Sequence, residues 1–162
     1  DASWSRGLGD VYKRQDIATI INDLKKDYTV IIMSEFQFDT GESKHVHAIP
    51  QVPDIRLWAG IIQCADHFLG CDSVGQHIAR AMDTTATVVT GATFPINITY
   101  PNEKSFDIFD MGEGTRTYSP LRMTGEDMQD MENDECMTMT KDDVKKIIDS
   151  CRKRLGLSLI HI

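Results

Sequence analysis

The feature that most constrains this chain is an alternation between segments with helical periodicity and short runs of β-branched residues. In residues 16–26 the apolar side chains recur at positions 17, 20, 21 and 24, a spacing that predicts an amphipathic helix. Residues 28–33 (YTVIIM) follow as a continuous apolar run, which is typical of a strand buried on both faces. The first two elements therefore predict a helix that leads into a core strand.

The alternation continues along the rest of the chain. A short strand is predicted at residues 45–49, and Asp54 then stands where it can cap a second helix. Thr140 and Asp143 form a T-x-x-D capping box that predicts the start of a last helix. The other predicted elements are strands at residues 67–70, 85–90 and 105–111 and a helix at residues 73–82.

Such alternation with short connections predicts parallel strands joined by crossover helices. We therefore expect an α/β fold, with a Rossmann-like open parallel sheet flanked by helices. In folds of this class, ligands bind beyond the carboxyl ends of the strands, where loops lead into helices. The residues that directly follow the predicted strands are therefore the candidates for a functional site.

Composition and charge exclude several classes of protein. The chain is 41% hydrophobic and 26% charged, which is ordinary for a globular domain. Its net charge of −8 argues against a general nucleic-acid binder, because a phosphate backbone would be repelled. No apolar run approaches the roughly 20 residues needed to cross a bilayer. The four cysteines form no C-x-x-C pair and no zinc-finger spacing, so we expect free thiols in a reducing cytoplasm and no metal site.

The two ends of the chain differ in character from its middle. Residues 10–15 (DVYKRQ) and 157–162 (LSLIHI) resemble translated sequencing-adapter sequence, as found at the edges of assembled environmental reads. We therefore set residues 1–15 and 157–162 apart as artefactual or disordered segments. The remaining residues, 16–156, have the length of one domain, and we expect the natural protein to begin well upstream of Asp16.

The segment that most suggests chemistry is LGCDSVGQHIARAM, residues 69–82, where a predicted strand turns into a helix. The first turn of a helix presents unpaired backbone amides, and the helix dipole attracts an anion there. Gly75 has no side chain, so a phosphate could approach the backbone there. Asp72 is itself an anion and would repel a phosphate, so it is better suited to accept hydrogen bonds from sugar hydroxyls. The alternative is a plain capped helix, with Asp72 and Ser73 as caps and His77 in the core. The residues assigned to phosphate contact, mostly through their backbone amides, are Ser73, Val74, Gly75, Gln76 and His77.

The residues around this turn also match a family pattern. The chain resembles glycosyltransferase family nine, the heptosyltransferase family, over about residues 16–156, and specifically the C-terminal half of that family. It departs from the family at Val74, where the family usually has glycine, and the family's first strand of this half lies upstream of Asp16. The matching residues are Ala65, Asp66, Gly70, Asp72, Ser73, His77, Ala79 and Ala81, then Val88, Gly91, Thr93 and Pro95, and further along Cys136, Met137, Thr138, Met139, Thr140 and Val144.

The resemblance implies one half of a two-domain glycosyltransferase of the GT-B arrangement, in which two Rossmann-like halves face each other across a cleft. The C-terminal half would bind a nucleoside diphosphate sugar. The absent N-terminal half would bind the acceptor, a glycan such as lipopolysaccharide core, and supply the catalytic acid or base. Transfer in the family is inverting and uses neither a metal nor a cofactor. The resemblance further implies a cytoplasmic enzyme with peripheral contact at the inner membrane face, and a fragment that is inactive alone.

Three further residues are candidates for contact with the nucleoside. Glu35 follows the predicted strand at residues 28–33 and is placed to accept hydrogen bonds from ribose hydroxyls, although it equally suits an exposed loop. Leu57 is a candidate wall for the base, and Thr93 is a candidate for the lining of the same cleft. Two other functions stay open: a nucleotide-sugar epimerase of the same architecture, and a non-catalytic module that binds a nucleotide or a sugar.

Overall fold

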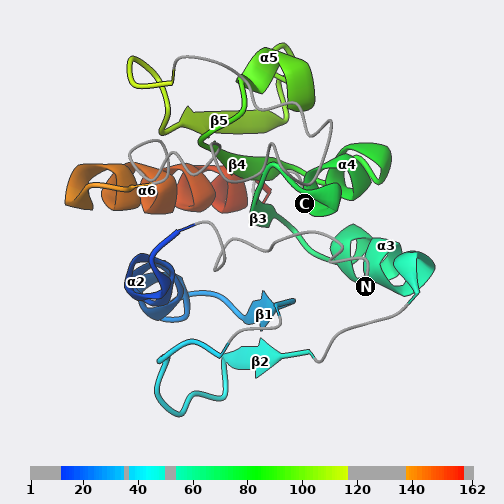
Figure 1. Ribbon diagram of the computed structural model, residues 1–162. Coiled ribbons are helices and arrows are strands. Elements are labelled where there is room, and N and C mark those ends of the chain that lie inside the picture. The colour runs from blue at the N-terminus through cyan, green and yellow to red at the C-terminus, as the bar shows by residue number, and fades with distance from the viewer. Residues whose placement is uncertain (1–11, 35–36, 50–53, 117–137, 159–162) are drawn as a thin grey trace.

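The structure, a computed structural model, describes residues 12–34, 37–49, 54–116 and 138–158 of the 162-residue chain. Helices and strands alternate through most of its length, as the sequence predicts (Figure 1). The elements are α2 (Arg14–Leu24), β1 (Val30–Ile32), β2 (Val46–Ala48), α3 (Ile55–Gln63), β3 (Phe68–Cys71), α4 (Val74–Ala81), β4 (Ala86–Thr90), α5 (Pro95–Ile98), β5 (Phe106–Asp110) and α6 (Lys141–Ser158).

Every strand pair in the described part of the chain is parallel, which confirms the α/β class. The strands form two small sheets, one of β1 and β2 and one in the order β3-β4-β5. The expectation of a single open sheet is therefore wrong for the described residues, because β1 pairs only with β2 and β3 pairs only with β4. The parallel strands and flanking helices remain compatible with a Rossmann-like fold.

The strands differ in how deeply they are buried. All five residues of β4 are buried, as its continuous β-branched sequence predicts. The same prediction is wrong for β1, where the Ile31 side chain is 46% exposed and its neighbours Val30 and Ile32 are only partly buried. The reason is that β1 lies in a two-stranded sheet, so one of its faces is incompletely covered.

Helices cover the strands on two faces, and each face has its own apolar cluster. On one face α2 and α6 pack against Leu69 and Val89, and on the other α3 and α4 pack against Phe68 and Val88 (Figure 1). Residues of β1 join the first cluster, and Met33, directly after β1, joins the second. The two sheets therefore share the same two helical layers.

The predicted helix caps are present. The carboxylate of Asp54 accepts a hydrogen bond from the amide of Arg56 at 2.8 Å, at the start of α3. Before α6, the amide of Thr140 donates to Asp143 Oδ2 at 2.8 Å and the amide of Asp143 donates back to Thr140 Oγ1 at 3.2 Å. These reciprocal bonds confirm the capping box and fix the residue at which α6 begins.

The folded part extends slightly beyond residues 16–156 at both ends. Tyr12 is buried in the first apolar cluster, α2 begins at Arg14, and α6 reaches Ser158. The adapter-like stretches thus contribute short pieces of the two terminal helices, while their origin stays a prediction. None of the described helices combines the length and the apolar content needed to cross a bilayer.

Candidate functional site

The turn that follows β3 lies where the direction of the chain across the sheets reverses. In Figure 1, β2 lies on one side of β1, and β3, β4 and β5 follow one another on the other side. In open parallel α/β folds the crevice at such a reversal, beyond the carboxyl ends of the strands, is the usual ligand site. Asp72 and Ser73 occupy this position because they join the end of β3 to the start of α4.

The start of α4 has the features expected of an anion site. Ser73 is the N-cap, with an extended backbone, and its side chain makes no capping hydrogen bond. Among the described residues, none accepts a hydrogen bond from the amides of Val74 and Gly75, whereas the amide of Gln76 already donates to the Ser73 carbonyl at 3.3 Å. Among the described residues, the two amides of the first turn thus have no acceptor, and the Ser73 side chain does not cap them, which is the arrangement of an anion site.

Asp72 has an unusual environment for a carboxylate. Burial raises its pKa from 3.8 to about 6, and hydrogen bonds from its own backbone and from the Thr93 side chain and the charge of Arg116 only partly oppose this rise. Above pH 6 the side chain is therefore mainly a partly desolvated carboxylate, which strongly favours hydrogen-bond donors such as hydroxyl groups. Perturbed acids of this kind gather at functional sites.

A buried arginine holds together the loops that lie beside Asp72. The Arg116 side chain is 3% exposed and forms an ion pair with Asp110, the last residue of β5. Its Nε donates to the carbonyl oxygen of Gly91 at 2.8 Å, and its guanidinium lies 4.6 Å from the centroid of the Phe94 ring. The sequence prediction missed Arg116 and Asp110, although an acid at the end of a parallel strand is the signal that selected Glu35.

Tyr12 lies next to the same acids. Its hydroxyl is buried and has no hydrogen-bond partner within the described part of the chain. Burial raises its pKa far above the usual value, and the nearby charge of Asp72 adds to this rise. The phenol is therefore neutral, and Asp72 keeps its negative charge without a proton donor from this side chain.

The structure corrects the physical reason given for Gly75. A Cβ atom at Gly75 would lie 2.6 Å from Cζ of Phe68, and one at Gly70 would lie 2.5 Å from the same atom. Both glycines therefore make room for the Phe68 ring, which packs beneath the start of α4. Gly75 still offers its amide to a ligand, but the space beside its Cα is already filled by protein.

Gln76 and His77 point away from the turn. The Gln76 side chain is completely buried, and its Nε2 donates to the Ile98 carbonyl at 3.0 Å, so it joins α4 to α5. His77 is exposed, and its Nδ1 lies 2.8 Å from the Tyr100 hydroxyl. The alternative in which His77 is a core residue is therefore wrong, and neither side chain is placed beside Asp72.

The remaining predicted residues have mixed placements. Thr93 lies close enough to Asp72 for its side chain to lower the pKa of that carboxyl, so the structure brings these two residues together. Val74 is partly buried and packs into the apolar cluster under α3 and α4. Leu57 is 58% exposed in the first turn of α3. Glu35 lies outside the described residues, so its predicted role stays a prediction.

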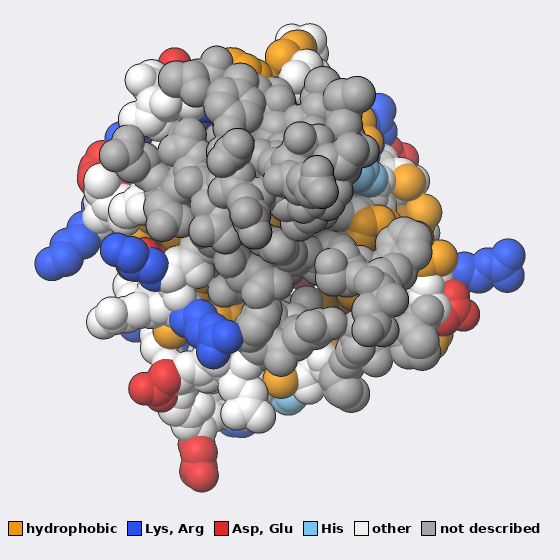
Figure 2. Space-filling model, in the orientation of Figure 1, with side chains coloured by type: hydrophobic (Ala, Val, Ile, Leu, Met, Phe, Trp, Pro, Cys, Tyr) orange, Lys and Arg blue, Asp and Glu red, His pale blue; other side chains and the backbone are white. Residues whose placement is uncertain are grey.

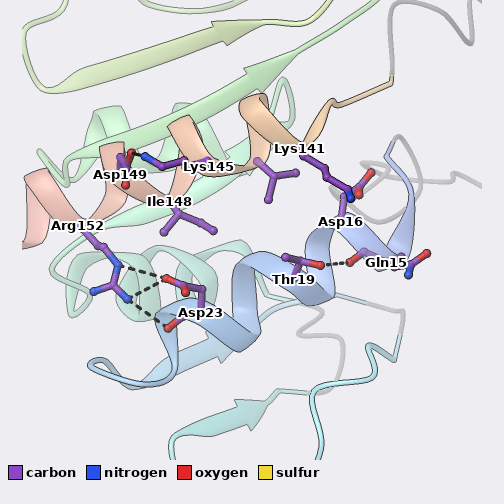
Figure 3. Close-up of a pocket in the computed structure, with 10 residues that line it drawn as sticks. Gln15, Asp16, Thr19, Asp23, Lys141, Lys145, Ile148, Asp149 and Arg152 are labelled. Atoms are coloured by element: carbon purple, nitrogen blue, oxygen red, sulfur yellow. Dashed lines mark hydrogen bonds and ion pairs between the residues drawn. The ribbon is translucent and has the colours of Figure 1, made fainter.

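A separate groove of about 630 Å³ lies between α2 and α6 (Figure 3). Val144 and Ile148 are its apolar lining, but the charged groups around it largely pair with each other. Arg152 binds Asp23 at 2.8 Å, and Lys145 binds Asp149 at 2.6 Å. Since four of its charged side chains are paired with each other, we place the candidate site at the Asp72 turn and treat the groove as the contact between two packed helices.

Charged side chains of both signs are interspersed along the visible margins of the molecule (Figure 2). Within the described ranges, no group of three or more His, Cys, Asp or Glu side chains is arranged to hold a metal ion. Cys64 is exposed, Cys71 and Cys151 are buried, and none of the three forms a disulfide within the described residues. The fourth cysteine, Cys136, lies outside the described residues.

No family model, no curated protein and no solved structure matches the chain. The resemblance to glycosyltransferase family nine therefore stays a prediction that rests on the residues quoted for it. The geometry of the turn after β3 supports a ligand site independently of that resemblance.

Proposed function

We propose that this chain is the donor-binding half of an inverting glycosyltransferase of the GT-B arrangement. Its ligand in this proposal is a nucleoside diphosphate sugar, bound where β3 turns into α4. The sugar is heptose-like and the acceptor is a glycan such as lipopolysaccharide core, as the family resemblance implies. A second half of the enzyme holds the acceptor and supplies the acid or base.

The observation that carries this proposal is the pairing of Asp72 with the open first turn of α4. The amides of Val74 and Gly75, which have no acceptor among the described residues, suit a diphosphate, because they combine hydrogen-bond donors with the positive end of the helix dipole. The partly buried Asp72 carboxylate suits sugar hydroxyls. An anion site and a hydroxyl site directly adjacent in sequence match the two parts of an activated sugar.

The same arrangement explains how this half contributes to transfer. As the acceptor attacks the anomeric carbon, negative charge develops on the departing nucleoside diphosphate. Amides that already point at the diphosphate stabilise this charge without reorganisation, which is the usual source of electrostatic catalysis. Asp72, hydrogen-bonded to the sugar, keeps the anomeric carbon turned toward the acceptor. Ser73 adds a further donor to the diphosphate.

Isothermal titration calorimetry of the whole chain with ADP-, GDP- and UDP-sugars tests the proposal. We expect saturable binding of one of these donors, and a loss of about tenfold or more in affinity for both Asp72→Asn and Ser73→Ala. Asp149→Asn, at an exposed position on α6, is the matched control and leaves the affinity unchanged. The proposal fails if the folded chain binds none of the donors, or if both site variants bind as the parent does.

The two other functions predict different products. A nucleotide-sugar epimerase releases an epimerised sugar from the donor without any acceptor, which product analysis by NMR detects. A non-catalytic binding module retains donor affinity but gives no transfer when the chain is joined to the upstream reading frame. The glycosyltransferase proposal requires transfer to an added glycan acceptor in that longer protein.

A further inference from the structure

Arg116 differs from the other charged residues because it lies in a loop and its guanidinium is nevertheless almost completely buried. Its side chain is 3% exposed. Burying a guanidinium is unfavourable unless its hydrogen-bonding groups find partners, so such a residue is expected to hold a defined geometry. The partners of Arg116 come from two different loops at the carboxyl ends of β4 and β5.

The contacts of Arg116 form a clamp between these loops. Its Nε donates to the Gly91 carbonyl, directly after β4, at 2.8 Å, and its Nη2 pairs with Asp110 at the end of β5. Asp110 also accepts a hydrogen bond from the Gly112 amide at 3.1 Å. A Cβ atom at Gly112 would lie 2.3 Å from the Gly91 carbonyl oxygen, so the two loops meet closely enough to require glycine.

The clamp fixes the residues on both sides of Thr93. Gly91 is held by its carbonyl, and the Phe94 ring lies against the guanidinium at 4.6 Å. Thr93, whose side chain lowers the pKa of Asp72, lies between them in the sequence. The charge of Arg116 also acts on Asp72 through space. Arg116 therefore influences Asp72 in two ways: it holds the loop that carries Thr93, and its positive charge acts on the carboxylate.

We propose that Arg116 is a positioning residue for the Asp72 site, which holds the loop after β4, and Thr93 within it, beside the end of β3. The pairing of Cys71 with Val89 places Asp72 next to that loop, and only the effect on donor binding rests on the proposed function. Because the side chain is buried under the loops, Arg116 does not itself contact the ligand. It belongs to neither the predicted phosphate site nor the predicted nucleoside site.

Arg154 provides a matched control at the other end of the same strand. Its Nε donates to Asp107 Oδ2 at 2.8 Å, and its Nη1 donates to the Lys104 carbonyl at 2.9 Å. It is also largely buried, with a side chain that is 17% exposed. Asp107 lies near the start of β5 and Asp110 at its end. Loss of either arginine thus breaks a similar clamp, but only Arg116 lies beside Asp72.

The first test needs no ligand. The carboxyl carbon of Asp72 is titrated by NMR in the parent chain, in Arg116→Met and in Arg154→Met. Arg116 is the charged group that acts on Asp72, and Asp72, Cys71, Asp110 and Arg116 all act on the buried Tyr12 hydroxyl. We expect Arg116→Met to raise the pKa of Asp72, because a positive charge and the support for Thr93 are both lost, and Arg154→Met to leave it unchanged. An unchanged titration of Asp72 in Arg116→Met overturns the proposal.

A double variant keeps the test decisive if Arg116→Met does not fold. Arg116→Met combined with Asp110→Asn removes both charges of the buried pair, so no unpaired carboxylate is left behind. Since the remaining change is the loss of the clamp on Gly91 and Thr93, the pKa of Asp72 still rises. If this folded double variant titrates as the parent does, Arg116 has no positioning role.

The second test measures donor affinity and separates this inference from the proposed function. We expect Arg116→Met to weaken the binding of the preferred nucleoside diphosphate sugar by about tenfold, and Arg154→Met to change it by less than about twofold. Arg116→Lys keeps the charge but cannot reproduce the two-loop clamp, so we expect the pKa of Asp72 to rise less than in Arg116→Met while the affinity still falls. Failure of every donor to bind the parent contradicts only the proposed function. Equal affinities in a chain that binds donor contradict the role of Arg116.

Discussion

The guanidinium of Arg116 donates from Nε to the carbonyl oxygen of Gly91 across 2.8 Å, and this bond joins two loops that are separated by a helix and a strand. Both loops lie at the carboxyl ends of parallel strands, beside the turn that carries Asp72. The candidate site is thus assembled from the ends of β3, β4 and β5. Its parts are held by buried polar contacts in addition to apolar packing.

Asp72→Asn is expected to make the protein more stable at neutral pH. The pKa of Asp72 is about 6 in the folded state and 3.8 in the unfolded state, so the folded state binds more protons between these values. The free energy of unfolding therefore falls as the pH rises from 3.8 to 6, because Asp72 must ionise in a buried position. Above pH 6 this destabilisation is complete. We expect Asp72→Asn to raise the free energy of unfolding at pH 7.5 by about 2 to 3 kcal/mol.

Urea unfolding of the parent and of Asp72→Asn at pH 7.5 and at pH 3.5 checks this expectation. The gain in stability should be present at pH 7.5 and nearly absent at pH 3.5, where Asp72 is mainly protonated in both the folded and the unfolded state. A variant that is less stable than the parent at pH 7.5 would show that the carboxylate stabilises the fold. Greater stability combined with lost donor binding is the pattern of a residue retained for function.

His67 is expected to make the fold sensitive to mild acid. Its Nδ1 lies 2.8 Å from the Thr85 hydroxyl and its Nε2 lies 2.9 Å from the Thr87 hydroxyl. Burial lowers the pKa of His67 from 6.5 to about 4, and the charge of Arg154 lowers it further while that of Asp107 opposes. The unfolded state therefore binds more protons between pH 4 and 6.5, and stability is lost as pH falls through this window, by up to about 3 kcal/mol.

The effect of His67 is best measured in the Asp72→Asn background. In the parent, Asp72 makes the free energy of unfolding change with pH in the opposite direction between pH 3.8 and 6. Urea unfolding from pH 7 to pH 4 should show a steady loss of stability, which His67→Gln reduces. Titration of the imidazole by NMR gives the folded pKa directly. A folded value near 6.5 would contradict the account of His67 as a buried neutral side chain.

Gly75→Ala is expected to destabilise the protein by about 1 to 3 kcal/mol through overpacking. The added Cβ would lie 2.6 Å from Cζ of Phe68, so the ring must move. In a Phe68→Leu background the same substitution should cost less, because the colliding ring atom is gone. The double-mutant cycle is measured by urea unfolding, and equal costs in the two backgrounds would show that Phe68 is not the obstacle.

Thr140→Ala is expected to cost about 1 kcal/mol of stability, the usual effect of removing an N-cap. Its Oγ1 accepts from the Asp143 amide at 3.2 Å, and its own amide donates to Asp143 Oδ2 at 2.8 Å. Thr140→Ser retains the hydroxyl and serves as the control. A Thr140→Ala protein with the thermal midpoint of Thr140→Ser would mean that the capping box contributes nothing to α6.

Local sequence patterns predicted the elements of this fold well, because each depends on neighbouring residues. The buried run of β4, the Asp54 cap and the capping box at Thr140 are all present. The two-sheet arrangement was not predictable in this way, since strand pairing depends on contacts between distant segments. The exposure of Ile31 follows from that pairing and has no signature in the sequence around it.

The candidate site was predictable only in part for the same reason. Asp72 and Ser73 follow a recognisable strand, so their position was clear from the sequence. The direction of a side chain is decided by tertiary packing, which buries Gln76 against Ile98 and turns His77 toward Tyr100. Arg116 was missed because its partners are distant in sequence, in the loop after β4 and at the end of β5.

NMR of the backbone amides during titration with a nucleoside diphosphate sugar shows where on the chain a donor binds. We expect saturable shifts of the Val74 and Gly75 amides, together with Thr93, and none at Thr19 or Lys145 in the groove between α2 and α6. Shifts confined to that groove, or no shifts at any donor concentration, would contradict a donor site at the turn from β3 into α4.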